Sequence, residues 1–179
     1  MSFRVIEGDL FAVGAEVLVC PTNAVGVMGA GLALEFSRRF PGLCPLYRGA
    51  CDRREHDAAH PVVWTGPLSS AADLMYGPGG GRWPIVVCVA TKRHWRDPSR
   101  LPDVAVGLRA LRELLPRLGA RMVALPALGC GLGGLCLDDV QVLMEAAFAD
   151  VPADVVLVLP PGSATPADEA RPSQAAESP

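Results

Sequence analysis

Lysine and arginine together number 16 in this chain, and Lys92 is the only lysine among them. Either residue supplies surface charge, but only lysine loses its proton at an accessible pH and becomes a nucleophile. Burial or a neighbouring cation favours the neutral amine, and Arg93 and Arg96 lie beside it. We therefore predict a catalytic role for Lys92, against the alternative that one lysine falls here by chance.

Two glycine-rich segments could bind phosphate. The segments "TNAVGVMGAG" (22–31) and "LGCGLGG" (128–134) each stand between an apolar run and a helical pattern. Glycine permits positive φ and exposes backbone N–H groups, and the following helix N-terminus favours an anion. One such segment can be an ordinary strand-to-helix turn. Two of them at one sheet edge predict a bound diphosphate, although no G-K-[ST] follows either, so neither is a Walker loop.

Three polar residues near these segments have two interpretations each. Asp9 can accept a hydrogen bond from an adenine amino group or cap a turn. Asn23 can bond a ribose hydroxyl or form an Asx turn. Cys130 can act as a nucleophile, but no base lies near it in the sequence, so a packed thiol is the favoured interpretation.

The segment after Lys92 combines cations with aromatic rings. Arginines beside an aromatic side chain can hold phosphates and stack a base, which suits nucleic acid. The alternative is a solvated charged loop that Trp95 anchors. The residues predicted to contact nucleic acid are Arg93, His94, Trp95 and Arg96.

Hydrophobic periodicity indicates an α/β fold. Apolar runs predict strands at 3–8, 15–21, 60–67, 73–78, 83–91, 121–128 and 153–160, and helical spacing predicts helices at 32–40, 42–54, 100–118 and 136–148. Buried strands that alternate with helices form a sheet covered on both faces. Such sheets bind ligands at the carboxyl ends of their strands, where the segments 22–31, 91–99 and 127–134 should meet.

Composition limits the remaining possibilities. The 179 residues are predicted to form one domain over 1–160, followed by a Pro-, Ala- and Ser-rich disordered tail over 161–179. A net charge of −3 excludes a uniformly basic nucleic-acid-binding protein. The six cysteines show no C-x-x-C pair and no Cys/His metal spacing, which predicts a reducing compartment, no metal and no cofactor. No apolar signal core or membrane-length run is present, so we expect a cytoplasmic protein without a membrane partner.

Four motifs together carry a family resemblance. They are "EGDLF" (7–11), "PTNAVGVMGAGLALEFSRRFP" (21–41), "TKRHWRDPSRLPDVAVGLRAL" (91–111) and "LPALGCGLGGL" (125–135). In this order they resemble the macrodomain family, and within it the branch of DarG-like antitoxin macrodomains and terminal ADP-ribose glycohydrolases. The resemblance covers residues 3 to 159 and leaves out the tail.

The resemblance implies a three-layer α/β/α fold with a mixed, largely parallel sheet, and ADP-ribose as the ligand. Asp9 would meet the adenine amino group with Leu10 beside it, and Asn23 would face the distal ribose. Lys92 would attack the anomeric carbon and open the ribose through a Schiff-base-type intermediate. The diphosphate would be held by Gly26, Val27, Met28, Gly29, Ala30 and Gly31 and by Leu128, Gly129, Cys130, Gly131, Leu132 and Gly133.

Two departures from the family pattern bear on the substrate. Protein-directed relatives place a catalytic Asp where this chain has Gly133, as DarG-like members do, which favours ADP-ribosylated thymidine in DNA. DarG-like members read "GGLDW" where this chain reads "GGLCL" (133–137). The resemblance therefore implies a hydrolase acting on thymidine in DNA, with acidic side chains of proteins as a second substrate class. It indicates no particular toxin partner.

Two other functions fit the same residues. The first is a non-catalytic reader that binds ADP-ribose, for which Lys92 would be dispensable. The second is a nucleotide-binding regulator without a preference for ADP-ribose over AMP or NAD.

Overall fold

The computed structural model describes residues 2–66 and 83–163. Within these ranges the strands form one sheet in the order β1-β6-β5-β2-β4-β3. Neighbouring strands are parallel except for β3, which runs antiparallel to β4. The predicted mixed, largely parallel sheet is therefore confirmed. The strands are β1 (Phe3–Glu7), β2 (Val17–Asn23), β3 (Val62–Trp64), β4 (Ile85–Lys92), β5 (Met122–Leu125) and β6 (Asp154–Leu159).

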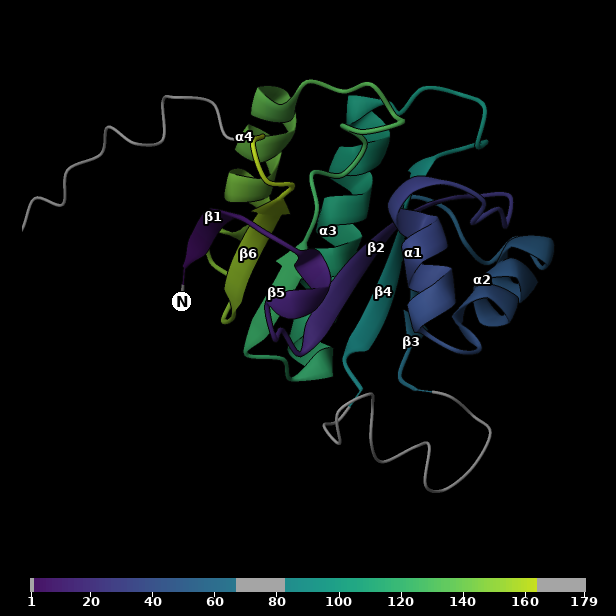
Figure 1. Ribbon diagram of the computed structural model, residues 1–179, viewed down its shortest axis with the longest axis horizontal. Coiled ribbons are helices and arrows are strands. Elements are labelled where there is room, and N and C mark those ends of the chain that lie inside the picture. Colours follow the sequence, from purple (N-terminus) through teal and green to yellow (C-terminus); the bar gives the residue numbers. More distant parts are fainter. Residues whose placement is uncertain (1, 67–82, 164–179) are drawn as a thin grey trace, which may run out of the picture.

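Helices cover both faces of this sheet (Figure 1). Helices α1 (Gly31–Arg39) and α2 (Leu43–Asp52) pack on one face, and α3 (Leu101–Leu118) and α4 (Leu137–Phe148) pack on the other. The three-layer α/β/α arrangement expected of a macrodomain is thus present. In the described ranges, no helix combines the length and the apolar character that a bilayer crossing requires.

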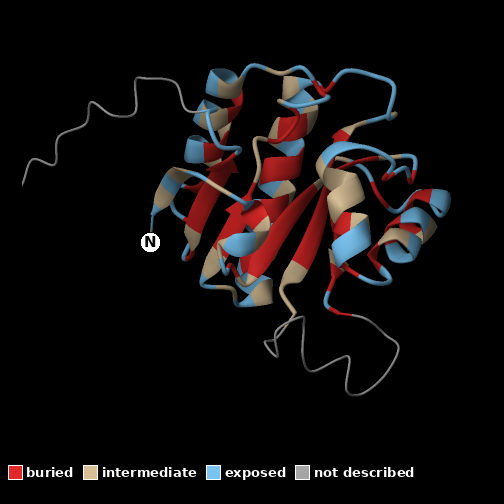
Figure 2. Ribbon diagram, in the orientation of Figure 1, coloured by how far each residue is buried: buried red, intermediate tan, exposed pale blue. Residues whose placement is uncertain are grey.

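Strand alternation divides the apolar side chains between two cores. Val17 and Val19 of β2 face α3 and α4, whereas Leu18 and Cys20 of the same strand face α1 and α2. Side chains alternate across a strand, so a strand buried on both faces is apolar at every position. Figure 2 shows the result, with the central strands red and the outer faces of the helices pale blue.

The predicted elements match the structure, with differences at some ends. The strand predicted over 121–128 ends at Leu125, because Pro126 has no N–H for the ladder and begins a loop. A 3-10 turn, η1 (Leu10–Ala12), was not predicted. The strand predicted at 73–78 lies outside the described residues, as does the tail from residue 164 onward.

Candidate active site

A cleft of about 1150 Å³ opens along the carboxyl ends of the parallel strands. Asp9 and Leu10, which follow β1, line it together with Leu159 at the end of β6. Lys92, at the end of β4, lines it as well. The two glycine-rich segments form the walls between these ends. The sheet edge therefore brings together the segments that the sequence analysis expected to meet there.

Lys92 and Asn23 end two adjacent strands side by side. A register shift at the end of β2 makes Asn23 the ladder partner of Lys92, and the amide of Ala24 donates to the Lys92 carbonyl at 3.0 Å. Register partners on neighbouring parallel strands lie beside each other in the sheet. The candidate nucleophile and the candidate ribose-binding amide are therefore adjacent.

The Lys92 side chain reaches the second glycine segment. Its Nζ donates to the carbonyl oxygen of Leu132 at 2.6 Å, and the side chain is partly buried. The Leu132 side chain is 74% exposed and lies against Gly31, where a Cβ would be 3.3 Å from Leu132 Cδ1. The two glycine segments thus approach each other directly beside the lysine.

Asn23 is buried, and its side chain is hydrogen-bonded to the first glycine segment. Its Oδ1 accepts from the amides of Val25 at 3.1 Å and Val27 at 3.3 Å, and its Nδ2 donates to the Val27 carbonyl at 2.7 Å. The Tyr47 hydroxyl lies 2.7 Å from the Asn23 carbonyl, 3.0 Å from Oδ1 and 3.3 Å from the backbone nitrogen. Asn23 therefore forms the predicted turn, whose bonds shape the first glycine segment, and its contact with a ribose stays a prediction.

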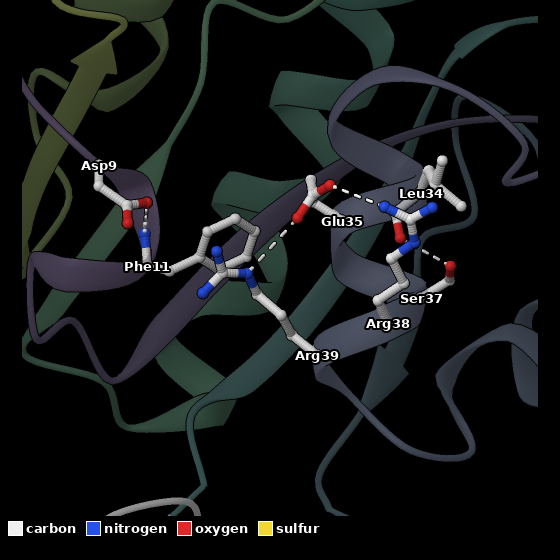
Figure 3. Close-up of polar contacts among 7 residues, drawn as sticks. All are labelled: Asp9, Phe11, Leu34, Glu35, Ser37, Arg38 and Arg39. Atoms are coloured by element: carbon white, nitrogen blue, oxygen red, sulfur yellow. Dashed lines mark hydrogen bonds and ion pairs between the residues drawn. The ribbon is translucent and has the colours of Figure 1, made fainter.

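The structure shows Asp9 as the cap of η1. The Phe11 amide donates to Asp9 Oδ1 at 2.9 Å (Figure 3). The Phe11 ring is covered by Arg39, whose Cζ lies 4.3 Å from the ring centroid, and Arg39 also pairs with Glu35 at 3.8 Å. One carboxylate oxygen of Asp9 is thus used for capping, as the second sequence interpretation proposed.

The second glycine segment packs tightly on Ser99. A Cβ on Gly133 would lie 2.2 Å from both the Gly129 carbonyl oxygen and Ser99 Oγ, and the Ser99 amide donates to the Gly133 carbonyl at 2.9 Å. No side chain fits at Gly133 without moving the backbone. The absence of a side chain at this position is thus required by the packing.

Several side chains of the loop after Lys92 contact other side chains of the protein. Arg93 forms two hydrogen bonds of 3.0 Å with the Asp103 carboxylate on α3. Arg96 lies over the Trp95 ring at 4.5 Å, and the His94 ring stacks on Trp95 at 5.6 Å. Trp95 and Arg96 line the cleft, whereas Arg93 and His94 do not.

Three of the predicted ligand-binding residues, Gly26, Met28 and Leu128, are not part of the cleft lining. Met28 and Leu128 are buried, one in each core, and Gly26 packs against α2 through Arg48 and Cys51. Their side chains, or the Cβ position at Gly26, pack inside the protein, and a contact of their backbone N–H groups with a diphosphate stays a prediction. The other predicted ligand-binding residues line the cleft: Asp9, Leu10, Asn23, Val27, Gly29, Ala30, Gly31, Gly129, Cys130, Gly131, Leu132 and Gly133.

Sequence reasoning missed several residues of the site. Tyr47 and Ser99 carry no local signal, because a buried tyrosine in a helix resembles a core residue and a serine in a loop resembles a solvated one. Pro161 and Ser163, at the start of the predicted tail, line the cleft, and the Gly162 amide donates to Glu7 at 3.1 Å. The last described residues are therefore part of the cleft wall.

Cys130 has the chemistry of a packed thiol. Burial, and secondarily the nearby Cys136, raise the pKa of Cys130 to about 11, so the thiol is protonated at neutral pH. It is therefore a poor nucleophile. All six cysteines are free thiols, and in the described ranges no three His, Cys, Asp or Glu side chains form a cluster that could hold a metal ion.

The fold and the two glycine loops define a macrodomain. The family model "Macro domain" matches residues 19–144, and this chain belongs to that family. It is 37% identical over 164 residues to a DNA ADP-ribosyl glycohydrolase of Mycobacterium tuberculosis, covering 91% of this chain and 43% of the relative. A DNA ADP-ribosyl glycohydrolase of Thermus aquaticus is 36% identical over 146 residues, which cover 81% of this chain and 37% of that relative. The chain spans less than half the length of these curated relatives.

Solved structures identify the same branch of the family. The macrodomain of Mycobacterium tuberculosis DarG superimposes with a TM-score of 0.77 and 33% identity, covering 90% of this chain and 99% of that chain. Thermosipho africanus DarTG in complex with ADP-ribose superimposes with a TM-score of 0.80 and 31% identity, covering 92% of this chain and 43% of that chain. The DarG-like resemblance of the sequence is thereby confirmed.

Proposed function

We propose that this chain is an ADP-ribosyl hydrolase that removes terminal ADP-ribose from thymidine in DNA. The observation that carries the proposal is the position of Lys92, beside Asn23 and in contact with the second glycine segment. The names of the Mycobacterium tuberculosis and Thermus aquaticus relatives support the reaction. The ADP-ribose complex of the Thermosipho africanus structure supports the ligand.

The shape of the cleft suggests how ADP-ribose would lie. The adenine would occupy the end lined by Asp9 and Leu10, and the diphosphate would lie between the glycine segments. Backbone N–H groups and the N-terminus of α1 favour an anion there. The distal ribose would then reach Lys92, and Trp95 and Arg96 beyond it would meet the nucleic acid.

The proposed reaction begins with the neutral Lys92 amine. Its lone pair forms a bond to C1″ of the distal ribose, and the bond from C1″ to the thymine nitrogen breaks with its electron pair on the imide. The C1″–O4″ bond then breaks as one proton passes from the nitrogen to O4″, so the ribose ring opens to a Schiff-base-type intermediate in which C1″ is doubly bonded to the Lys92 nitrogen. Water adds to that carbon, releases the amine and gives free ADP-ribose, and the imide takes up a proton.

The leaving group must depart with little help from an acid. Among the described residues, the titratable side chains that line the cleft are Asp9, Lys92, Arg96 and Cys130, and Asp9 follows the edge strand β1, away from Lys92 on β4. Gly133 leaves no space for another carboxylate. A thymine imide or a carboxylate can leave as an anion, so ADP-ribosylated acidic side chains of proteins are the second proposed substrate class. Serine ethers should resist cleavage.

The test is release of ADP-ribose from a modified thymidine oligonucleotide by wild type, Lys92→Ala and Lys92→Arg. Arginine preserves the charge but cannot supply a neutral nucleophile. We expect both variants to lose turnover while calorimetry shows that ADP-ribose still binds. Wild-type turnover by Lys92→Arg would refute the nucleophile. If no protein, wild type included, releases ADP-ribose although it binds, the chain is a non-catalytic reader instead.

The same assay ranks the substrates. Parallel incubations use the oligonucleotide, a glutamate-modified protein and a serine-modified protein. The oligonucleotide should be cleaved, and the glutamate-modified protein should be cleaved if acidic side chains are substrates. The serine-modified protein should not be cleaved. Rapid cleavage of the serine linkage would mean that an acid assists departure, contrary to the proposed chemistry.

A further inference from the structure

The Ser99 hydroxyl is buried without a partner. Ser99 is 6% exposed. Among the buried side-chain oxygens and nitrogens of residues 2–66 and 83–163, Ser99 Oγ is the one without a hydrogen-bond partner. An unpaired buried hydroxyl lowers stability, whereas alanine would occupy the same space without that penalty. A serine at this position therefore requires an explanation beyond packing.

The hydroxyl lies directly beneath the second glycine segment. Both Ser99 Oγ and the Gly129 carbonyl oxygen lie 2.2 Å from the point where a Cβ of Gly133 would be. The two oxygens therefore lie no more than about 4.4 Å apart, on the side of Gly133 where a side chain would stand. The Gly129 carbonyl accepts from the Leu135 amide at 3.0 Å, and a carbonyl oxygen can accept a second hydrogen bond. A small shift of the segment would pair hydroxyl and carbonyl.

The segment is held by hydrogen bonds to the loop that follows β4. Lys92 donates to the Leu132 carbonyl and the Ser99 amide donates to the Gly133 carbonyl, so two successive carbonyls are bound by the two ends of that loop. A movement of the glycine segment over a ligand would therefore alter the environment of the lysine too.

We propose that Ser99 is a positioning residue whose hydroxyl bonds the Gly129 carbonyl only when the second glycine segment closes on a bound diphosphate. This inference rests on the proposed function, because it takes ADP-ribose as the ligand of that segment. A ligand shifts an equilibrium between two arrangements only by its differential affinity for them. The Ser99 hydroxyl supplies part of that difference, since it is unpaired in one arrangement and paired in the other.

The test is Ser99→Ala, for which stability and affinity should change in opposite directions. We expect a melting temperature equal to or above that of wild type, because the unpaired hydroxyl is gone. Calorimetry should show ADP-ribose binding weakened roughly three- to tenfold, the range for one neutral hydrogen bond. If Ser99 had a merely structural role, the substitution would lower the melting temperature and the affinity together.

Ser37→Ala is the matched control. The Ser37 hydroxyl on α1 donates to the Leu34 carbonyl at 2.7 Å (Figure 3), and Ser37 does not line the cleft. Its removal should leave the affinity for ADP-ribose unchanged.

The outcomes separate this inference from the proposed function. Wild-type affinity in Ser99→Ala, or a parallel loss of stability and affinity, overturns the role of Ser99 while leaving ADP-ribose as the ligand. If calorimetry detects no binding of ADP-ribose to wild type, the proposed function fails and the inference fails with it.

Discussion

The Nζ of Lys92 lies 2.6 Å from the carbonyl oxygen of Leu132, 40 residues further along the chain. This hydrogen bond joins the proposed nucleophile to the loop proposed to hold the diphosphate. An N–H directed at that oxygen restricts the position of Nζ to the side of the cleft formed by the second glycine segment. Any change that displaces the loop should thus affect both binding and turnover.

Gly133→Ala should displace that loop. The new Cβ would lie 2.2 Å from the Gly129 carbonyl oxygen and from Ser99 Oγ, so the backbone must move. We expect the free energy of unfolding in urea to fall by about 1–3 kcal/mol, as for other overpacked sites. Turnover should fall roughly tenfold or more, because the lysine is misplaced.

Gly131→Ala is the control for stability, because a Cβ there meets no atom within 4 Å. Its free energy of unfolding should stay within about 0.5 kcal/mol of wild type. Equal stability of the two variants would show that the contact at Gly133 is not a tight one.

Tyr47→Phe should disturb the first glycine segment through Asn23. The hydroxyl lies within hydrogen-bonding distance of the Asn23 carbonyl, amide nitrogen and Oδ1, and removing it takes one hydrogen-bond partner from each of these buried atoms. We expect a loss of about 1–3 kcal/mol in the free energy of unfolding and weaker ADP-ribose binding.

Burial raises the pKa of Tyr47 above its ordinary value, so the phenol stays neutral and the effect of Tyr47→Phe should not vary across neutral pH. Calorimetry and urea denaturation measure the two changes. A stability loss with unchanged affinity would mean that the amides of Val25 and Val27 orient Asn23 without the tyrosine.

His56 should make stability depend on pH. Burial lowers the pKa of His56 from its ordinary 6.5, although the His60 carbonyl and Asp57 act in the opposite direction. Its ring lies 2.9 Å from the Thr22 hydroxyl. The unfolded chain takes up the proton near 6.5 and the folded chain only at lower pH. The stability contribution is therefore complete above about pH 6.5 and is lost as pH falls through the lower value.

His56→Gln should flatten this dependence. Urea denaturation between about pH 7.5 and about pH 5 would measure it, because this range lies above the titration of the carboxylates. Glu16 and Asp57, whose pKa values are lowered from 4.5 and 3.8, act at lower pH. If the free energy of unfolding of His56→Gln changed with pH as steeply as that of wild type, another titrating group would be responsible.

Arg96→Ala should weaken binding of nucleic acid. Arg96 lines the cleft over Trp95, and removing one phosphate-binding cation should reduce the salt dependence of affinity by about one unit of slope. Anisotropy with an ADP-ribosylated single-stranded oligonucleotide, in a Lys92→Ala background that prevents turnover, would measure it. Arg112→Ala on α3, outside the cleft, is the control and should retain the parent slope. Identical slopes for the two variants would place the nucleic acid elsewhere.

Local patterns in the sequence carried much of this description. Continuous apolar runs in β2 and β4 predict strands buried on both faces, because successive side chains of a strand point to opposite sides of the sheet. The glycine segments and the single lysine can be recognised in the sequence, because the residue types that follow a strand indicate which groups can bind or react there. Together they indicated the fold, the cleft edge and the candidate nucleophile before any contact was known.

Ambiguities in single residues were resolved only by their neighbours. The structure shows that Asp9 caps η1 and that Asn23 forms a turn, while their contacts with adenine and ribose stay predictions. Met28 and Leu128 belong to glycine segments, yet their side chains pack in the cores. Local sequence cannot distinguish a residue that faces a ligand from one that supports the loop.

The sequence by itself determined which residue can act as an amine nucleophile and which loops can expose backbone N–H groups, because both properties belong to residue types. Only the tertiary structure decided that Lys92 pairs with Asn23, that Leu132 accepts from it, and that Ser99 packs under Gly133. Those contacts join residues far apart in the chain. A periodic pattern reports which side of an element is buried, but it does not identify the partner that buries it.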